Sequence, residues 1–329
     1  MIRNIDRLSH GQYDLLVIGG GINGAAVANL AAMNGLKTGL LEKGDFASGT
    51  SSKSTKLVHG GLRYLENFEF GLVKEALKER AIQLRSAPHL VKPLGFVIPV
   101  FNTSSRPFWM YKIGVGLYDF LSGKYNIERH RVLSKEEVKH LVPDVGTEGL
   151  LGGIMYYDAQ MDDARLCLEN VLNADKNGAH IANYVEVKSL IKENGKTVGV
   201  MAKDLLSGER FEIRSRKIVC AAGPWTNQFV QKELHDSPRK MRLTKGVHIV
   251  YRDKFCDHAV FLSSKKDKRI FFIIPFMGNS LIGTTDTDYV GNPDDVKVDE
   301  EDIRYLFQAA QKSFPKHEFS KEKIISTFA

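Results

Sequence analysis

A glycine-rich turn near the N-terminus constrains the fold of this 329-residue chain more than any other feature. The apolar run at residues 13–18 leads into Gly19, Gly21 and Gly24, and an alanine-rich helical stretch follows at residues 23–34. In such a strand–turn–helix setting the first glycine allows a tight turn, the second lets a pyrophosphate approach the backbone, and the third lets the helix pack against the strand. The pattern predicts a dinucleotide-binding βαβ unit; a glycine turn that serves packing alone is the alternative.

An acidic residue follows this turn at the spacing expected for nucleotide binding. The second apolar run, at residues 38–41, ends at Glu42. It lies about 20 residues after the last glycine, where a carboxylate accepts hydrogen bonds from ribose hydroxyls. The backbone of Ile22 and Asn23, where the helix opens, would present N–H groups to the phosphates. We therefore expect these residues to bind the cofactor.

The cofactor is expected to be FAD rather than a nicotinamide nucleotide. After the second strand the chain enters a Ser/Thr-rich loop at residues 48–56, whose hydroxyls can donate to a second phosphate or to a flavin. A late strand at residues 217–220 ends in Ala221, Ala222 and Gly223, small residues that would let an extended cofactor approach the backbone. Both features favour FAD.

Nucleotide-binding elements bracket a strand-rich insertion, which suggests two interleaved domains. From the apolar periodicity we predict helices at 70–86, 134–141, 162–177 and 300–313, strands at 94–101, 179–190 and 323–328, a hairpin of 197–204 with 210–219 around Ser207 and Gly208, and three or four strands over 243–284. The predicted FAD-binding domain comprises residues 1–90 and 156–235, the substrate domain residues 91–155 and 236–315, and residues 316–329 begin a last FAD-domain segment.

Composition limits the class of partner and the compartment. Lys and Arg total 46 and Asp and Glu 39, a formal net charge of +7 without blocks of like charge. This mild excess suits a phosphorylated substrate or an anionic membrane surface and is too diffuse to indicate nucleic acid. The three cysteines, Cys167, Cys220 and Cys256, are too few and too scattered for a disulfide framework or a metal site, so we expect buried thiols in a reducing compartment.

The chain is expected to be cytoplasmic or peripheral on the cytoplasmic face of a membrane. Its first residues lack the apolar core of a signal peptide. The longest apolar-rich stretch, residues 107–121, contains Lys112 and Asp119 and is shorter than the ~20 residues that span a bilayer. This stretch is either a buried core helix or a helix that contacts the bilayer surface.

Several motifs together resemble those of FAD-dependent glycerol-3-phosphate dehydrogenases, a group similar to D-amino-acid and sarcosine oxidases. The motifs are GGGINGAAVANLAAMNGL, LLEKGDFASGTSSKSTKLVHGGLRYLE, CAAGPW, LTKGVHIV and IIPFMGNSLIGTTDTDY. The resemblance runs through the whole chain. It implies an α/β fold with a Rossmann-like FAD-binding domain of the glutathione-reductase/D-amino-acid-oxidase type and an interleaved mixed-sheet substrate domain. It also implies that this chain is an N-terminal fragment without the family's C-terminal motifs and cap domain.

The resemblance assigns roles to individual residues. Ser51, Ser52 and Ser54 would lie along the pyrophosphate and ribityl chain, or form an ordinary polar loop. The backbone of Val187 would meet adenine, or Val187 is a plain strand residue. The cofactor-binding set that the resemblance implies is Gly19, Gly21, Ile22, Asn23, Gly24, Glu42, Ser51, Ser52, Ser54, His59, Val187, Ala222 and Gly223.

The substrate residues implied by the resemblance lie in the HGGLRYLE and LTKGVHI motifs and in a Thr-Thr pair. Arg63 would bind the substrate phosphate, since a guanidinium makes two parallel bonds to phosphate oxygens; a surface salt bridge is the alternative. His248 would be the catalytic base, or a structural histidine of the core. The remaining expected substrate contacts are Tyr64, Lys245, Thr284 and Thr285, and Arg63 and Tyr64 are catalytic candidates together with His248.

The implied reaction is oxidation of sn-glycerol 3-phosphate to dihydroxyacetone phosphate, with hydride transfer to flavin N5 and electrons passed to membrane quinone. The alternatives are an oxidase that uses oxygen, a flavin-dependent amine or amino-acid oxidase, and, for a fragment, an inactive nucleotide-binding module. The sequence leaves the oligomeric state open, a homodimer included.

Overall fold

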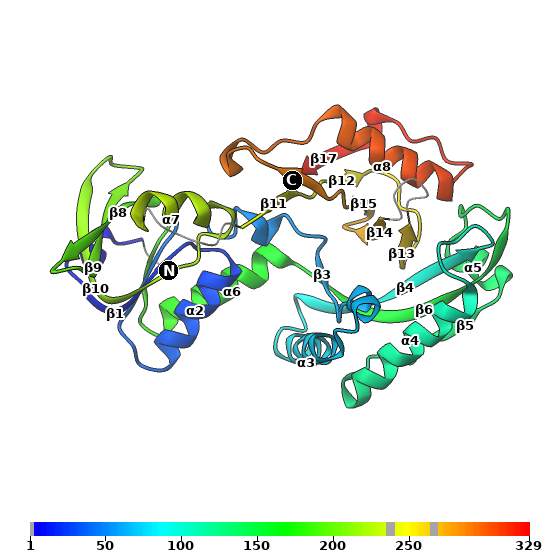
Figure 1. Cartoon of the computed structure of the whole chain (residues 1–329), viewed down its shortest axis with the longest axis horizontal. Helices are drawn as coiled ribbons and strands as arrows, with labels where there is room; N and C mark the ends of the chain where they lie inside the picture. Colours follow the sequence, from blue (N-terminus) through cyan, green and yellow to red (C-terminus); the bar gives the residue numbers. More distant parts are fainter. Residues whose placement is uncertain (1–2, 235–240, 264–268) are drawn as a thin grey trace. The chain divides into compact units, whose positions relative to one another are not determined.

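The computed structural model describes residues 3–234, 241–263 and 269–329 and divides into two compact units (Figure 1). Unit 1 comprises Met1–Ser54 and Asp162–Leu243, and unit 2 comprises Thr55–Met161 and Thr244–Ala329. The units interleave along the chain, as the sequence suggested. Residues 55–90 belong to unit 2 rather than to the first FAD-domain segment, because their helix packs on the strands of unit 2.

Unit 1 is built on a sheet that is parallel at one end and antiparallel at the other. The strand order is β7-β2-β1-β10-β9-β8, and β7, β2, β1 and β10 pair in parallel. The hairpin of β9 and β10, predicted around Ser207 and Gly208, is confirmed. The strands are β1 (Gln12–Ile18), β2 (Thr38–Leu41), β7 (His180–Ala182), β8 (Val185–Glu193), β9 (Lys196–Asp204) and β10 (Arg210–Cys220).

Two helices cover one face of this sheet. α2 (Ile22–Met33) and α6 (Asp163–Lys176) pack together there, with alanines of α2 against Val171 and Val17. The small side chains of α2 let it lie close to the strands. The other face holds a second apolar cluster, against which α1 (Ile5–Ser9) and α7 (Thr226–Leu234) lie.

The strand predicted at residues 179–190 is wrong as one element. It is divided into β7 and β8, because Tyr184 adopts a left-handed conformation (φ 54°) between them. There the N–H of Tyr184 donates to Gly44 O at 3.0 Å, and the N–H of Val185 donates to Glu42 O at 2.8 Å. The chain therefore leaves β2 at this point and enters the antiparallel part of the sheet.

Unit 2 is built on a long mixed sheet. Its order is β17-β12-β15-β14-β13-β4-β6-β3, with β5 paired to β6, and only β13 with β4 is parallel among the described pairings. A separate small ribbon joins β11 to β16. The strands are β3 (Leu57–Val58), β4 (Val91–Phe101), β5 (Arg131–Leu133), β6 (Leu150–Met161), β11 (Leu243–Lys245), β12 (His248–Tyr251), β13 (Ala259–Ser263), β14 (Ile270–Phe276), β15 (Asn279–Gly283), β16 (Thr287–Tyr289) and β17 (Ile324–Phe328).

Two strand predictions differ from this sheet. The described residues of 243–284 form β11 to β15, five strands rather than three or four, because short turns separate β11 from β12 and β14 from β15. The last segment, predicted to open an FAD-domain element, pairs through β17 with β12 and so belongs to unit 2.

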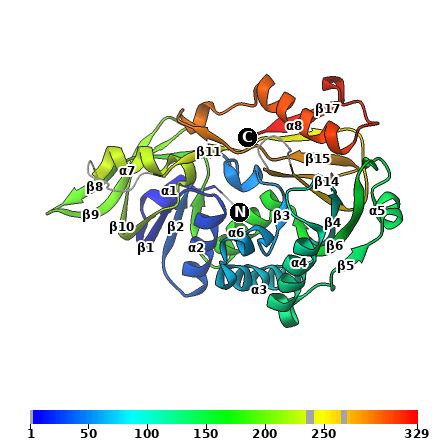
Figure 2. The ribbon, with the colours of Figure 1, turned by 45° about the vertical axis from the view of Figure 1, so that its right-hand side comes forward.

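Helices cover both faces of the unit 2 sheet. α3 (Phe70–Ser86) and α4 (Phe108–Ser122) lie side by side on one face, as Figures 1 and 2 both show. α5 (Lys135–Leu141) and α8 (Glu300–Ser313) pack on the other face. Alternate residues of β4 serve the two layers: Phe96 and Ile98 face α3 and α4, whereas Val97 faces the opposite core.

The two ends of this sheet meet through side chains. Thr55 Oγ1, just before β3, lies 3.0 Å from His248 Nε2 on β12. Lys56 Nζ lies 5.2 Å from the centre of the Phe328 ring on β17. The sheet therefore curls, and the β3 end of the chain contacts the β12–β17 end.

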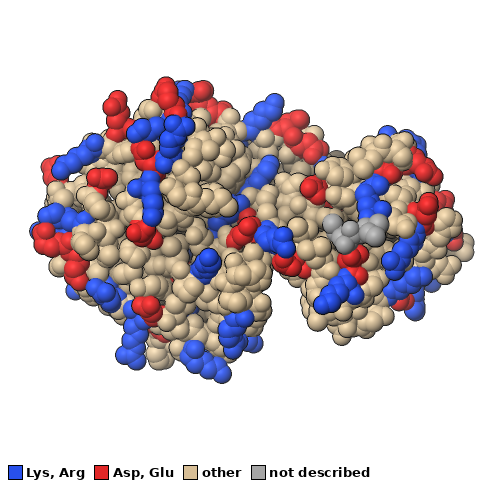
Figure 3. All heavy atoms as spheres, turned by 180° about the vertical axis from the view of Figure 1, so that it is seen from behind, with Lys and Arg blue, Asp and Glu red and all other residues tan. Residues whose placement is uncertain are grey.

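Residues 107–121 were expected to form either a buried core helix or a helix that contacts the bilayer surface, and α4 has features of both. Val115 and Tyr118 are buried in the core, whereas Trp109, Ile113 and Phe120 are 59%, 62% and 80% exposed. Within the described residues no helix is long and apolar enough to cross a membrane. Basic and acidic side chains are interspersed on the face seen in Figure 3, as expected from the diffuse excess of charge.

Candidate FAD-binding and substrate sites

The predicted cofactor residues of unit 1 gather at the carboxyl ends of its parallel strands. The N–H of Ala221, after β10, donates to Ile18 O at the end of β1 at 2.8 Å. A Cβ at Gly19 (φ 107°) would lie 2.4 Å from Ala221 O, so only glycine fits this approach. Ala222 and Gly223 follow directly and begin the short helix Gly223–Trp225. In open α/β sheets this edge is where ligands bind.

The start of α2 lies against the same turn. A Cβ at Gly24 would lie only 1.9 Å from Gly19 O, which is the close helix approach that the third glycine was predicted to allow. The N–H of Ile22, in the first turn of α2, donates to Ser51 Oγ at 2.8 Å. Gly21 leaves room for this hydroxyl, which would lie 3.1 Å from a Cβ there. The structure thus brings Ser51 to a helix N-terminus that favours an anion.

Glu42 holds the backbone around this edge. Its Oε2 accepts from the N–H of Gly20 at 2.7 Å, and its Oε1 accepts from the N–H of Gly44 at 2.7 Å. Each carboxylate oxygen has a second lone pair for a ribose hydroxyl. Val187 lies on β8, two residues after Val185, whose N–H donates to the backbone of Glu42.

The other loop serines lie nearby in different roles. Ser54 Oγ donates to Asp163 Oδ2 at 2.8 Å. Asp163 is the first residue of α6, so this hydrogen bond ties the Ser54 hydroxyl to the N-terminal end of that helix. Ser52 Oγ lies 3.5 Å from Gly49 O. Cys167 of α6 reaches the turn from beneath, with Sγ 3.6 Å from Gly20 O. Burial, then the nearby Glu42 and Asp163, raise the pKa of this thiol to about 11.

The residues present fit the ADP end of FAD. Ser51 Oγ accepts from the N–H of Ile22 and so keeps its own O–H to donate to a phosphate, the glycine positions leave the main chain accessible, and Glu42 has acceptor capacity for the ribose. Ile22, Asn23 and the three predicted glycines all lie within this arrangement.

His248, the predicted base, is buried in unit 2 with 3% exposure. Its ring stacks on Phe328, with centroids 5.0 Å apart, and its Nε2 lies 3.0 Å from Thr55 Oγ1. Its Nδ1 is buried and has no hydrogen-bond partner among the residues that the structure describes. Burial, reinforced by the positive charge of Lys56, lowers the pKa of His248 to about 4.

Arg63, Tyr64 and His59 lie together on the segment after β3. Arg63 is exposed in the short helix Leu62–Asn67, and it forms no ion pair within the described part of the chain, so the surface salt bridge considered from the sequence is not observed. Tyr64 packs partly against the core that also contains Phe328. His59 is exposed. No hydrogen bond, ion pair or ring contact joins these residues directly to His248 within residues 3–234, 241–263 and 269–329.

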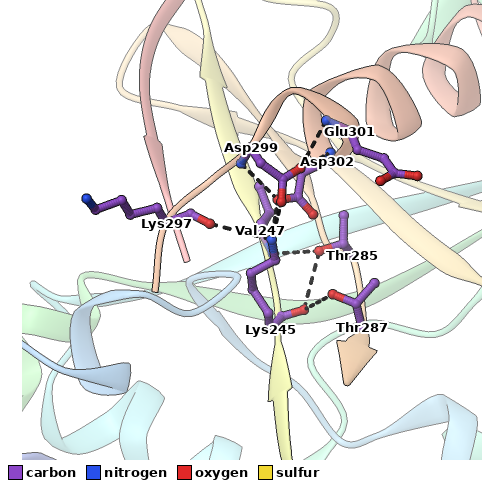
Figure 4. Close-up of polar contacts among 8 residues, drawn as sticks. All are labelled: Lys245, Val247, Thr285, Thr287, Lys297, Asp299, Glu301 and Asp302. Atoms are coloured by element: carbon purple, nitrogen blue, oxygen red, sulfur yellow. Dashed lines mark hydrogen bonds and ion pairs between the residues drawn. The ribbon is translucent and has the colours of Figure 1, made fainter. Parts of the chain in front are cut away.

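Lys245 is held by two carboxylates at the N-terminal end of α8 (Figure 4). Its Nζ lies 2.8 Å from Asp299 Oδ2 and 2.6 Å from Asp302 Oδ2, and its side chain is 11% exposed. Burial would lower the pKa of Lys245, but the two hydrogen bonds outweigh burial and raise it. Asp299 is also the N-cap of α8. The structure therefore gives Lys245 a structural ion pair, which the sequence did not foresee.

Thr284 and Thr285 differ in burial and in their hydrogen bonds. Thr285 is 3% exposed, and its Oγ1 accepts from the N–H of Val247 at 2.9 Å (Figure 4). This hydroxyl joins the β15–β16 connection to the chain just before His248. Thr284 is half-buried, and its Oγ1 donates to Thr285 O at 2.8 Å. Of the two, Thr284 is the more accessible.

Comparisons with known proteins place the chain in a family. The family signature described as "FAD dependent oxidoreductase" matches residues 14–329, and the chain belongs to this family. The predictions of FAD and of the fold class are thereby confirmed.

The similar proteins carry narrower names than the family description does. The chain is 43% identical to a "Glycerol-3-phosphate dehydrogenase" of Synechocystis sp. (strain ATCC 27184 / PCC 6803 / Kazusa), over all of this chain and 62% of the relative. It is 41% identical to an "Alpha-glycerophosphate oxidase" of Streptococcus pyogenes serotype M1, over 99% of this chain and 54% of the relative. The glycerol-3-phosphate dehydrogenase of Bacillus halodurans complexed with FAD superposes with a TM-score of 0.83 at 36% identity, covering 98% of this chain and 57% of that one. The resemblance drawn from the sequence is confirmed, and the chain spans little more than half the length of these relatives.

The close approach of α2 to the Gly19 carbonyl can be tested by adding one methyl group at Gly24. Gly24→Ala should weaken FAD binding by about tenfold or more, because the new Cβ would lie 1.9 Å from Gly19 O and relieving this clash requires shifts that typically cost ~1–3 kcal/mol. The measurement is titration of the FAD-free protein by flavin fluorescence. Gly114→Ala is the matched control, since a Cβ at this helical position in α4 meets nothing within 4 Å. Equal affinity of both variants would contradict the assignment.

The ion pairs of Lys245 predict a pH-dependent stability. The pKa of Asp299 is lowered to about 2, first by the hydrogen bond from Lys245, so this pair stabilises the fold above pH ~4 and is lost as the pH falls towards 2. Lys245→Met should lower the thermal midpoint at pH 7, and the difference from wild type should shrink between pH 4 and pH 2.

Lys139→Met is the control, because Lys139 pairs with Glu136 on the exposed face of α5, where such pairs contribute little. A Lys245→Met difference that stays constant down to pH 2 would show that the charge pair is not its cause.

Proposed function

We propose that the protein containing this chain oxidises glycerol 3-phosphate to dihydroxyacetone phosphate with FAD. The names of its relatives support the substrate. The observation that carries the chemistry is the buried, neutral imidazole of His248 in the same unit as the guanidinium of Arg63, which forms no ion pair with any residue that the structure describes. FAD, when bound, supplies the hydride acceptor.

In this proposal His248 accepts the proton of the substrate's secondary hydroxyl. If Nε2–H donates to Thr55 Oγ1, Nδ1 carries the free lone pair and is the atom that takes the proton. A pKa of about 4 keeps this atom unprotonated at neutral pH. Burial and the charge of Lys56 make His248 a weak base, and for the same reason they keep its imidazole in the unprotonated form that a base requires.

Arg63 binds the substrate phosphate in the proposal. Its exposed guanidinium has no competing carboxylate in the described structure, so it can make two parallel hydrogen bonds to phosphate oxygens. Tyr64 and Thr284 are the proposed neighbouring contacts. Lys245 and Thr285 are engaged within unit 2, Lys245 with Asp302 and Thr285 with the N–H of Val247, just before His248.

Anaerobic flavin reduction tests the proposal. Glycerol 3-phosphate should bleach the visible flavin absorbance of the FAD-loaded protein, and His248→Ala should slow bleaching by about 10²–10⁴-fold while substrate binding changes little. Arg63→Lys should mainly weaken binding. His140→Ala, at an exposed site on α5, is the control. A flavin that stays oxidised with substrate bound, or that glycine or sarcosine reduces instead, would refute the assignment.

The depressed pKa of His248 predicts the pH dependence of catalysis. The acid limb of kcat/KM should lie near pH 4, below the ordinary value of 6.5 for histidine. Lys56→Met should move the limb to higher pH, because the Lys56 charge is one cause of the shift. Ionisation of the substrate is the same for both proteins and cancels in the comparison. A limb that Lys56→Met leaves in place would remove His248 as the titrating base.

The proposed electron acceptor is a membrane quinone, reached from an anionic membrane surface. The exposed Trp109, Ile113 and Phe120 of α4, with Lys112 between them, suit a membrane surface. Phe120→Ser should reduce co-sedimentation with anionic liposomes severalfold, whereas Leu206→Ser, a 65% exposed leucine in a turn of unit 1, should not. Rapid oxygen consumption without liposome binding would instead favour oxygen as the acceptor.

A further inference from the structure

A buried polar network in unit 2 ends on the turn that leads to the proposed phosphate ligand. Asp158 of β6 accepts three hydrogen bonds at Oδ1: from Arg80 Nη1 at 2.6 Å, Tyr118 OH at 2.7 Å and the N–H of Gly60 at 3.1 Å. The residues Arg80, Tyr118 and Asp158 are at most 1% exposed. These groups are polar, yet they lie in the core between α3, α4 and the sheet.

Arg80 anchors this network to the surrounding backbone. Its Nη1 also donates to Tyr157 O at 2.9 Å, and its Nη2 donates to Tyr125 O at 3.1 Å. Its Nε is buried and has no hydrogen-bond partner in the described residues. A buried ion pair adds little net stability because both charges lose their hydration. The more specific effect of the network is therefore the geometry that it imposes.

That geometry is imposed on Gly60. Its N–H is shared between Asp158 and Tyr118, whose hydroxyl oxygen accepts at 2.8 Å. A Cβ at Gly60 would lie 2.3 Å from both Tyr118 OH and Leu77 Cδ2, so the backbone rests directly on these side chains. Burial, then the charge of Asp158, raise the pKa of Tyr118 well above its usual value, so its phenol remains a donor at every working pH.

The fixed turn sets the position of the residues that follow. Gly61 is left-handed (φ 74°) and begins the short helix Leu62–Asn67, which carries Arg63 and Tyr64. Since Arg63 itself contacts no other described side chain by hydrogen bond or ion pair, its placement comes from this backbone.

We infer that Tyr118, with Asp158 and Arg80, is a positioning residue that holds the Gly60–Gly61 turn so that Arg63 meets the substrate phosphate. This inference rests on the proposed function. Beyond that function, the inference states that buried residues which do not contact the substrate control its affinity.

Tyr118→Phe is the sharpest variant, since Gly60 and Arg80 keep their bonds to Asp158. In the FAD-loaded protein it should raise KM for glycerol 3-phosphate about fivefold, the factor for one net hydrogen bond, with kcat nearly unchanged. Tyr156→Phe is the matched control: this tyrosine is 3% exposed, its ring lies edge-on to Tyr118 at 5.9 Å, and within the described residues it makes no hydrogen bond to Gly60 or Asp158. Equal KM values for the two variants would overturn the inference.

A double variant separates positioning from general loosening of the core. With Arg63→Lys already present, Tyr118→Phe should raise KM much less than fivefold, because both changes act on the same contact. Fully multiplicative effects would overturn the inference.

A second readout does not depend on the substrate. Amide hydrogen exchange of the segment 57–65 should be several times faster in Tyr118→Phe than in Tyr156→Phe. If wild type fails to reduce its flavin with glycerol 3-phosphate, the proposed function fails, yet faster exchange would still support control of the turn. Unchanged exchange would overturn that control whatever the activity.

Discussion

The parallel pairing of β1 with both β2 and β10 is the constraint on which unit 1 depends. It brings three strand ends to one edge, so the Gly19 turn, Glu42 and the Ala221–Ala222 backbone meet although they are far apart in sequence. The absence of side chains at Gly19 and Gly24 makes this meeting possible, because any Cβ there would overlap backbone atoms. The resulting edge combines a helix N-terminus with a carboxylate, which suits the two chemically different ends of an ADP group.

Unit 2 places its polar chemistry inside apolar layers. His248 is neutral because burial and a neighbouring cation both disfavour its charged form. Lys245 is less deeply buried and remains charged because two carboxylates accompany it. Desolvation is thus common to both, and the nature of the neighbours decides the outcome.

The sequence predicted local elements well and tertiary partners poorly. The helices at 70–86 and 134–141 and the glycine turn depend on neighbours a few residues apart, and the structure has them as expected. Thr285 and Lys245 were expected at the substrate, but residues about 40 and 57 positions away engage them. Arg80 offered a signal, since a charged side chain occupied the apolar stripe of its helix; its partner Asp158 lies on β6, for which no pattern was recognised.

The thiol of Cys167 has a consequence of a different kind. It is wholly enclosed beneath the Gly20 carbonyl, and its pKa of about 11 leaves almost no thiolate at neutral pH. Alkylating reagents attack the thiolate. Cys167 should therefore not react with them as long as the glycine turn around Gly20 covers it. The half-buried Cys220 supplies an internal comparison within the same unit. The molecule therefore contains its own chemical reporter of local opening beneath the cofactor turn, without any introduced label.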